Sequence, residues 1–166
     1  MKDTPVIDGA GDATGLRIAV IVSAYHASVT ESLREGALAA LAHANAGADR
    51  AVTIISVPGA FEIPLVARRA AESGDFDALV CLGCIIRGET PHFDYIASAV
   101  AHGITTASQA TGVPITFGVL TTNTPEEAQA RAGVGRANKG WEAAMAAVQV
   151  ANVVRALRSG GDGAKG

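Results

Sequence analysis

The sequence contains little of what marks nucleic-acid-binding, membrane-spanning or disulfide-rich proteins. Only 4% of its 166 residues are aromatic, two are cysteine, and the formal net charge is -3. No cluster of Lys or Arg occurs, which argues against nucleic acid or an anionic membrane surface as a partner. No apolar run is long enough to cross a bilayer, and residues 1–5 lack the apolar core of a signal peptide, so we expect a cytoplasmic protein.

Motifs for cofactors and metals are also missing. No GxGxxG follows the first strand that the sequence predicts, and no GxxxxGK[ST] occurs, so we expect neither a dinucleotide nor a nucleoside triphosphate cofactor. Cys81 and Cys84 lie in an apolar run without a second cysteine pair or a histidine cluster. This pattern supports neither a disulfide framework nor a zinc site, and we expect both thiols to pack in the core.

The residues that are present predict one domain with an aliphatic core. Hydrophobic residues make up 49% of the chain, and β-branched runs alternate with segments of helical periodicity. Strands are predicted at residues 17–23, 51–57, 77–86 and 113–120. Helices are predicted from Ser28 or Thr30 to about 47, and at about 60–73, 91–111, 125–132 and 138–157. This alternation predicts an α/β fold: a flavodoxin-like three-layer sandwich with a four-stranded parallel sheet and helices on both faces.

The two ends of the chain differ in composition from the domain at residues 16–158. Residues 1–15 are rich in Gly, Asp, Thr and Pro and predict an arm that could add an edge strand to a neighbouring subunit. The tail at residues 159–166 is predicted to be disordered. At the helix after the third strand, we expect Thr90 or a neighbour to cap the first turn, with Pro91 at its first position.

Polar or glycine-rich segments follow each predicted strand, at residues 23–26, 58–62, 87–92 and 121–124. Because the carboxyl ends of parallel strands meet at one edge of a sheet, these segments should form one small-molecule site. The turn at 87–92 should direct backbone N–H groups beyond the third strand, near Arg87 and His92. It is therefore a candidate anion site.

Several residues of this edge have both a functional and an ordinary interpretation. Tyr25 could stack on a planar ring or cover the end of a strand, and Glu62 could bind ligand hydroxyls or stabilise a helix start. His92 could transfer protons as a neutral imidazole or be merely solvated. Arg131 lies near the end of a predicted helix, where a cation is favourable even when no ligand is bound. Lys139 opposes the dipole at a helix start, which an anionic or carbonyl-bearing ligand would explain.

Four segments resemble the 6,7-dimethyl-8-ribityllumazine synthases of riboflavin biosynthesis. They are VPGAFEIP (57–64), LGCIIRGETPHFDY (82–95), GVLTTNTPEEA (118–128) and NKG (138–140), and the similarity extends over about residues 16–157. The family condenses 5-amino-6-(D-ribitylamino)uracil with 3,4-dihydroxy-2-butanone 4-phosphate, losing inorganic phosphate and two waters. The reaction uses no metal and no organic cofactor, so none is expected here.

The resemblance implies roles for particular residues. Tyr25 would stack on the pyrimidine, Ala60 and Phe61 would bind through backbone atoms, and Glu62 would hold the ribityl hydroxyls. His92 would relay protons. The other substrate-binding residues that it implies near these positions are Cys84, Ile85, Ile86 and the phosphate-binding turn Gly88, Glu89 and Thr90.

In the family a neighbouring subunit completes the site. The resemblance also implies that the chain forms a homopentamer. Phe117 would line the site from that subunit, Arg131 would bind the phosphate, and Lys139 would contact the ring carbonyl. The link at residues 133–138 keeps the length found in the family, which permits a shell of twelve pentamers, and association with riboflavin synthase is a further expectation.

Two departures from the family and two alternative functions remain. The link at residues 133–138 differs from the family's usual glycine-rich sequence while keeping its length. Residues 24–26 read Ala-Tyr-His where many members have Arg-Phe-Asn, which keeps the stacking ring but changes the polar contacts beside it. The same fold could serve as a binding module for riboflavin or a related ring, or as a shell-forming structural protein.

Overall fold

The computed structural model describes residues 4–47 and 51–162. Their elements lie in the order expected for alternating strands and crossover helices. They are β1 (Ile18–Ser23), α1 (Ala27–His43), β2 (Val52–Val57), the 3-10 turn η1 (Ala60–Glu62), α2 (Ile63–Glu72), β3 (Ala78–Ile86), α3 (His92–Thr111), β4 (Ile115–Thr122), α4 (Pro125–Arg131) and α5 (Lys139–Asp162).

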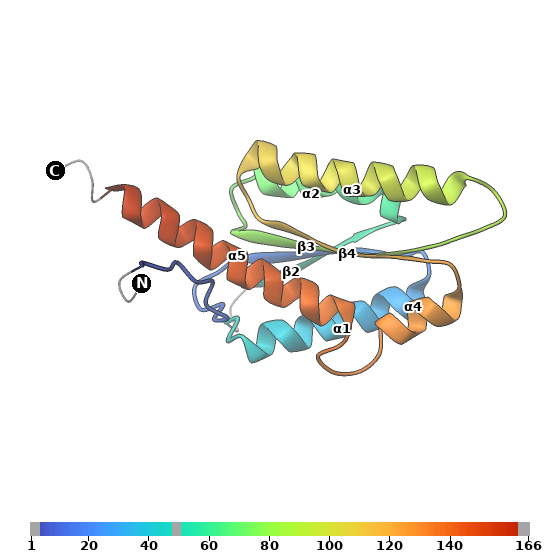
Figure 1. Ribbon diagram of the computed structural model, residues 1–166, viewed down its shortest axis with the longest axis horizontal. Helices are drawn as coiled ribbons and strands as arrows, with labels where there is room; N and C mark the ends of the chain where they lie inside the picture. Colours follow the sequence, from blue (N-terminus) through green and yellow to red (C-terminus); the bar gives the residue numbers. More distant parts are fainter. Residues whose placement is uncertain (1–3, 48–50, 163–166) are drawn as a thin grey trace.

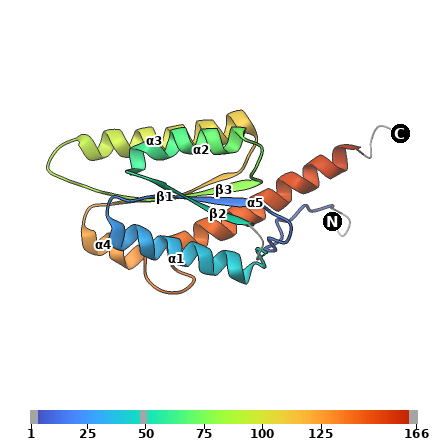
Figure 2. The same ribbon diagram turned by 180° about the vertical axis from the view of Figure 1, so that it is seen from behind.

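The sheet has four parallel strands in the order β2-β1-β3-β4. Figures 1 and 2 show α1, α4 and α5 on one face and α2 and α3 on the other. β1 and β3 occupy the centre, where every residue of β1 is buried, because helices cover both faces. This arrangement confirms the predicted flavodoxin-like three-layer sandwich.

Each central strand divides its side chains between two hydrophobic cores. Val20 and Leu82 point toward α1 and α5, whereas Ile21 and Cys81 point toward α2 and α3. The two-residue period of a strand sends neighbouring side chains to opposite faces, so continuous apolar runs supply both cores at once. Both cysteines are buried and free, as expected.

The arm lies along its own chain in residues 10–13. Asn152 of α5 donates hydrogen bonds from Nδ2 to the carbonyl oxygens of Ala10 (2.7 Å) and Asp12 (2.8 Å). The amide of Ala13 donates to the carbonyl of Ala44 at 2.6 Å. Residues 4–15 form no strand here; pairing of the arm with another subunit stays a prediction, and residues 1–3 lie outside the described part.

The predicted caps of two helices are wrong. α1 begins after His26, whose left-handed backbone (φ 58, ψ 51) turns the chain sharply out of β1, so Ser28 and Thr30 lie inside the first turn. At α3, Pro91 occupies the N-cap position, one residue earlier than predicted, and no side chain caps the helix there. Thr90 therefore does not act as the cap. The ends of α1 also differ from the prediction, since the helix stops at His43.

Three other boundaries differ from the sequence expectations. The segment predicted as one helix from residue 60 begins with the 3-10 turn η1. β4 lies two residues later than predicted, because the carbonyl of Val113 accepts a hydrogen bond from the Ser108 hydroxyl and Pro114 lacks an N–H for the sheet. α5 continues beyond Leu157 through Asp162, so residues 159–162 are helical rather than disordered, and residues 163–166 of the predicted tail lie outside the described part.

The described part of the chain contains neither a candidate membrane span nor a candidate metal site. Within residues 4–47 and 51–162, no helix is both long and apolar enough to cross a membrane. The same residues contain no group of three His, Cys, Asp or Glu side chains placed to hold a metal ion.

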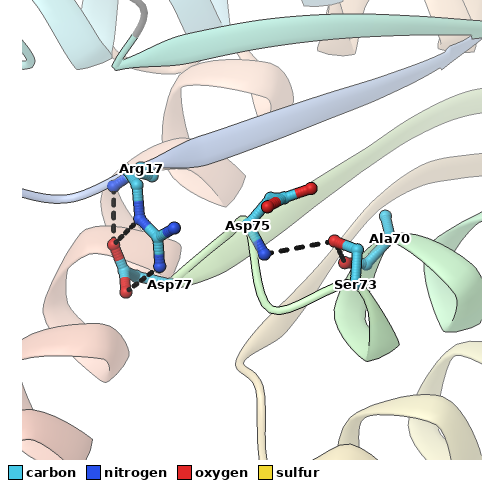
Figure 3. A network of polar contacts seen from close by, with 5 residues as sticks. All are labelled: Arg17, Ala70, Ser73, Asp75 and Asp77. Carbon is cyan, nitrogen blue, oxygen red and sulfur yellow. Dashed lines mark hydrogen bonds and ion pairs between the residues drawn. The ribbon is translucent and has the colours of Figure 1, made fainter.

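An ion pair joins the amino ends of the two central strands. The Asp77 carboxylate accepts hydrogen bonds from the Arg17 backbone N–H at 2.8 Å and from its guanidinium at 3.3 Å, as Figure 3 shows. Burial raises the pKa of Asp77, but the hydrogen bonds from Arg17 outweigh it and leave the pKa lowered. A lowered pKa means that the folded state favours the charged carboxylate.

We expect Asp77→Asn to lower the melting temperature at pH 7 by about 2–4 °C, because Asn keeps the shape but loses the charge. The higher melting temperature of the wild type should be present at pH values above 3.8, the ordinary pKa of the Asp77 carboxyl group, and should disappear as the pH falls below this value. Thermal unfolding between pH 3 and pH 7 measures the difference. Asp75→Asn is the matched control, since the Asp75 carboxylate in the same loop makes no contact with Arg17 in Figure 3. A pH-independent difference would contradict the assignment.

Candidate active site

The carboxyl edge of the sheet contains a hollow of about 910 Å³. We call it the principal hollow, and its size falls within the range of small-molecule sites. The loops that leave β1, β2 and β3 form it together with the first turns of α3. Ten of the predicted site residues line it: Tyr25, Ala60, Phe61, Glu62, Cys84, Ile85, Ile86, Gly88, Thr90 and His92.

Backbone hydrogen bonds bring the exits of β1 and β2 together. The N–H groups of Ala24 and Tyr25 donate to the carbonyls of Val57 (2.8 Å) and Pro58 (3.1 Å), which continues the parallel ladder beyond the strands. Tyr25 therefore lies beside the loop that carries Glu62. Its side chain is 68% exposed, so a ring face is free to stack on a planar ligand.

The Glu62 carboxylate folds back over Gly59 at the exit of β2. A Cβ at Gly59 would lie 2.9 Å from Glu62 Oε2, which is the end of a flexible, exposed side chain that can move aside. Glu62 ends η1 and is exposed, and its side chain caps no helix. The carboxylate therefore remains able to accept hydrogen bonds from a ligand.

Arg87 holds the turn after β3. Its Nε donates to Asn123 Oδ1 at 3.1 Å, its guanidinium pairs with Asp94 at 3.3 Å, and it lies 4.4 Å from the centre of the Phe93 ring. Its backbone N–H donates to the carbonyl of Thr122 at 2.8 Å. Arg87 thus joins β3, β4 and α3, and it acts as a support for the 88–92 turn instead of an open cation for a ligand.

Only some residues of the 88–92 turn line the principal hollow. Gly88, Thr90 and His92 line it, whereas Glu89 does not. His92 is the first residue of α3 and is exposed. The Figure 1 view places the β3–α3 connection at the same end of the sheet as the β4–α4 connection.

A second hollow, of about 450 Å³, lies along the free edge of β4 against α5. We call it the edge hollow. It contains three further predicted residues, Phe117, Arg131 and Lys139, and shares no lining residue with the principal hollow, while Glu89 lines neither hollow. The structure therefore divides the predicted site into two groups on one chain.

The two cations of the edge hollow have partners of different kinds. Arg131 ends α4 and donates from its guanidinium to the carbonyl of Glu127 at 3.0 Å, as expected for a cation at a helix end. Lys139 pairs with Glu142 across one turn of α5, with 2.7 Å between Nζ and Oε2. This surface pair partly offsets the unfavourable position of Lys139 at the helix start. Both cations remain exposed to solvent.

Several residues that line the two hollows had no role assigned to them from the sequence. His26 lies in the predicted segment 23–26 but had been given no role of its own; it meets the Tyr25 ring edge-on, with 4.6 Å between ring centres. Phe93, Tyr95 and Ile96 extend the principal hollow along α3. Glu142 lines the edge hollow. The helical period counted from His92 could have indicated Ile96, but the left-handed turn that places His26 has no signal in the sequence.

Together these features define an α/β protein with a hollow of small-molecule size at the carboxyl edge of a parallel sheet. A family model described as 6,7-dimethyl-8-ribityllumazine synthase matches residues 15–155. The chain belongs to this family, as the four sequence segments indicated. The family is one of enzymes of the transferase type, in riboflavin biosynthesis.

Burial makes Cys84 a poor nucleophile although it lines the principal hollow. It raises the pKa of Cys84 from 9.0 to about 11, and that of Cys81 to about 12, because the folded state disfavours the thiolate. We expect iodoacetamide to alkylate Cys84 at pH 8 about a hundredfold more slowly than an unfolded thiol. The rate should keep rising about tenfold per pH unit beyond pH 9.

Mass spectrometry of a Cys81→Ala variant isolates the reaction of Cys84. The urea-unfolded form of the same variant gives the reference rate. A folded-state rate that levels off near pH 9 would show that burial does not control this thiol.

Proposed function

We propose that the chain condenses 5-amino-6-(D-ribitylamino)uracil with 3,4-dihydroxy-2-butanone 4-phosphate to give 6,7-dimethyl-8-ribityllumazine, phosphate and water. This is the penultimate step of riboflavin biosynthesis. The observation that carries the proposal is the principal hollow, which combines an exposed aromatic ring, a free carboxylate and an imidazole at one edge of the sheet in a member of this family.

The pyrimidine substrate occupies the part of the hollow formed by the exits of β1 and β2. Tyr25 stacks on the flat ring, and the backbone of Ala60 and Phe61 contacts its edge. Glu62 accepts hydrogen bonds from the ribityl hydroxyls, a role that fits a carboxylate folded over the glycine beside it. Stacking and hydrogen bonding together fix the orientation of the amine that reacts.

The phosphorylated substrate lies at the turn after β3. Gly88, Glu89 and Thr90 offer backbone N–H groups to the phosphate, and Arg131 neutralises its charge. His92 lies next to this turn and moves protons between the reacting groups, since imidazole both accepts and donates a proton near neutral pH. Most of the rate enhancement comes from holding the two substrates in reactive geometry.

The complete site forms between two copies of the chain. The edge hollow of one copy, with Phe117, Arg131 and Lys139, faces the principal hollow of its neighbour in a homopentamer. Exposed apolar side chains around the principal hollow support this contact: Phe61 is 60% exposed and Tyr95 75%. Assembly of twelve pentamers into a shell, and association with riboflavin synthase, extend the same proposal.

Mixing the two substrates with the purified protein tests the activity. We expect the absorbance of the lumazine to appear much faster than in buffer, with release of inorganic phosphate. Binding of the pyrimidine without turnover would instead support a binding module. A shell that neither binds nor reacts would support the structural alternative.

Arg131→Ala should raise the KM for the butanone phosphate about tenfold or more while changing the KM for the pyrimidine less than about threefold. The reason is that the guanidinium contacts only the phosphorylated substrate. Steady-state kinetics with each substrate varied in turn give both constants. Arg136→Ala is the matched control, because Arg136 lies in the link that follows α4, near the Trp141 ring, and does not line the edge hollow. Equal effects of the two substitutions would refute the role of Arg131.

Co-assembly of two impaired variants tests whether the site is shared. We expect His92→Ala and Arg131→Ala to be strongly impaired when assembled alone, His92→Ala by about a hundredfold. Co-expressed in equal amounts, they should recover roughly a quarter of the wild-type sites, since random pairing joins the intact half of each variant. Variants assembled separately and then mixed are the control. No recovery after co-expression would place the site within one chain.

A further inference from the structure

A single buried amide connects the segments that carry the two cations of the edge hollow. Asn138 is 3% exposed and lies in the link between α4 and α5. Its Oδ1 accepts hydrogen bonds from the N–H groups of Gly140 (2.7 Å) and Trp141 (3.3 Å). Its Nδ2 donates to the carbonyls of Ser32 (3.0 Å) and Gly133 (2.8 Å). These four bonds use every donor and acceptor direction of the amide.

The two ends of the amide have different structural effects. Oδ1 caps the first turn of α5, where Lys139 is the first residue. Nδ2 ties the link to α1 and to Gly133, two residues after Arg131. The backbone on both sides of the edge hollow is therefore held by one side chain that does not itself line the hollow.

The surroundings leave room for this amide and little else. A Cβ on Gly36 of α1 would overlap the Asn138 amide, and a Cβ on Gly140 would overlap the carbonyl of Leu33. The two helices thus approach closely through glycines, and the amide fills the space where they meet. A side chain fixed in this way transmits any change in its bonds to the link.

Asn152, on the helix that Asn138 caps, is an asparagine with a purely structural role. Its Nδ2 also donates two hydrogen bonds to backbone carbonyls, those of Ala10 and Asp12. These bonds hold the arm, and the residue lines neither hollow. Asn138 and Asn152 therefore make the same pair of donated bonds, but only those of Asn138 reach the segment that carries Arg131.

We propose that Asn138 is a positioning residue that sets the placement of Arg131 relative to Lys139 and so determines the affinity of the edge hollow for a phosphate group. The proposal rests on the proposed function in one respect, which is that the edge hollow receives a phosphorylated substrate. Asn138 itself touches no substrate. Its effect passes through the backbone at Gly133 and at the start of α5.

The substitution Asn138→Ser distinguishes the effect of Oδ1 from that of Nδ2. A serine hydroxyl still caps α5, because serine is a preferred N-cap residue, but it is too short to replace both bonds from Nδ2. We expect the dissociation constant for inorganic phosphate to rise about tenfold, as expected when bonds that align a cation are lost. The KM for the butanone phosphate should rise in parallel. Calorimetry and steady-state kinetics on the assembled protein measure the two constants.

Asn152→Ser is the matched control, since it removes two bonds of the same kind that are made from α5, the helix that Asn138 caps. Its phosphate affinity should stay within about twofold of wild type, even where its melting temperature falls as much as that of Asn138→Ser. Sedimentation confirms that both variants assemble like the wild type.

The outcomes separate this proposal from the proposed function. Equal phosphate dissociation constants for the two variants would overturn the role of Asn138. A wild-type protein that binds phosphate but does not turn over the two substrates would overturn only the proposed reaction. A wild-type protein that binds no phosphate would overturn both.

Discussion

The parallel register of β1 with β3 is the constraint on which the rest of the structure depends. Ile18 to Val22 pair in order with Ala78 to Leu82, and both strands are buried between two helical layers. Parallel strands cannot be joined by a tight turn, so each needs a helical crossover, and all four strands end at the same edge. The ladder thus brings together loops that are far apart in the sequence. Tyr25, Glu62 and His92 become neighbours of one hollow because of backbone pairing rather than contacts among themselves.

The same sheet explains why Arg131 and Lys139 lie apart from the residues that are proposed to bind the pyrimidine ring. β4 has a partner on one side only, and its free edge forms the edge hollow with α5. Arg131 and Lys139 therefore lie around the outside of β4, whereas the principal hollow lies at the ends of β1, β2 and β3. A chemistry that needs both groups is consistent with two copies that each present one half. The α4–α5 link is important for this division, because the link affects where Arg131 and Lys139 lie in the edge hollow.

Local patterns predicted the strands, the helices and most of the principal hollow, because β-branched runs and the residues that follow them are contiguous in the sequence. Features that depend on distant partners were missed. The left-handed backbone of His26 is costly for a residue other than glycine, and only the turn out of the sheet explains it. The buried amide of Asn138 has partners at Ser32, Gly133 and the start of α5, which no local pattern reveals. Glu89, predicted from a contiguous motif, does not line the hollow, since a turn presents only some of its residues inward.

The direction of α5 places its C-terminal end away from the principal hollow. Arg155 and Ser159 of α5 line a separate hollow together with Leu16, Asp77 and Val113, which precede β1, β3 and β4. Figure 1 shows the arm and the end of α5 on the same side of the molecule, opposite the loops of the principal hollow. A tag, fluorophore or fusion partner attached next to the arm or to the end of α5 would start from the side away from the principal hollow. That side is therefore suited to immobilisation or display without obstruction of the principal hollow.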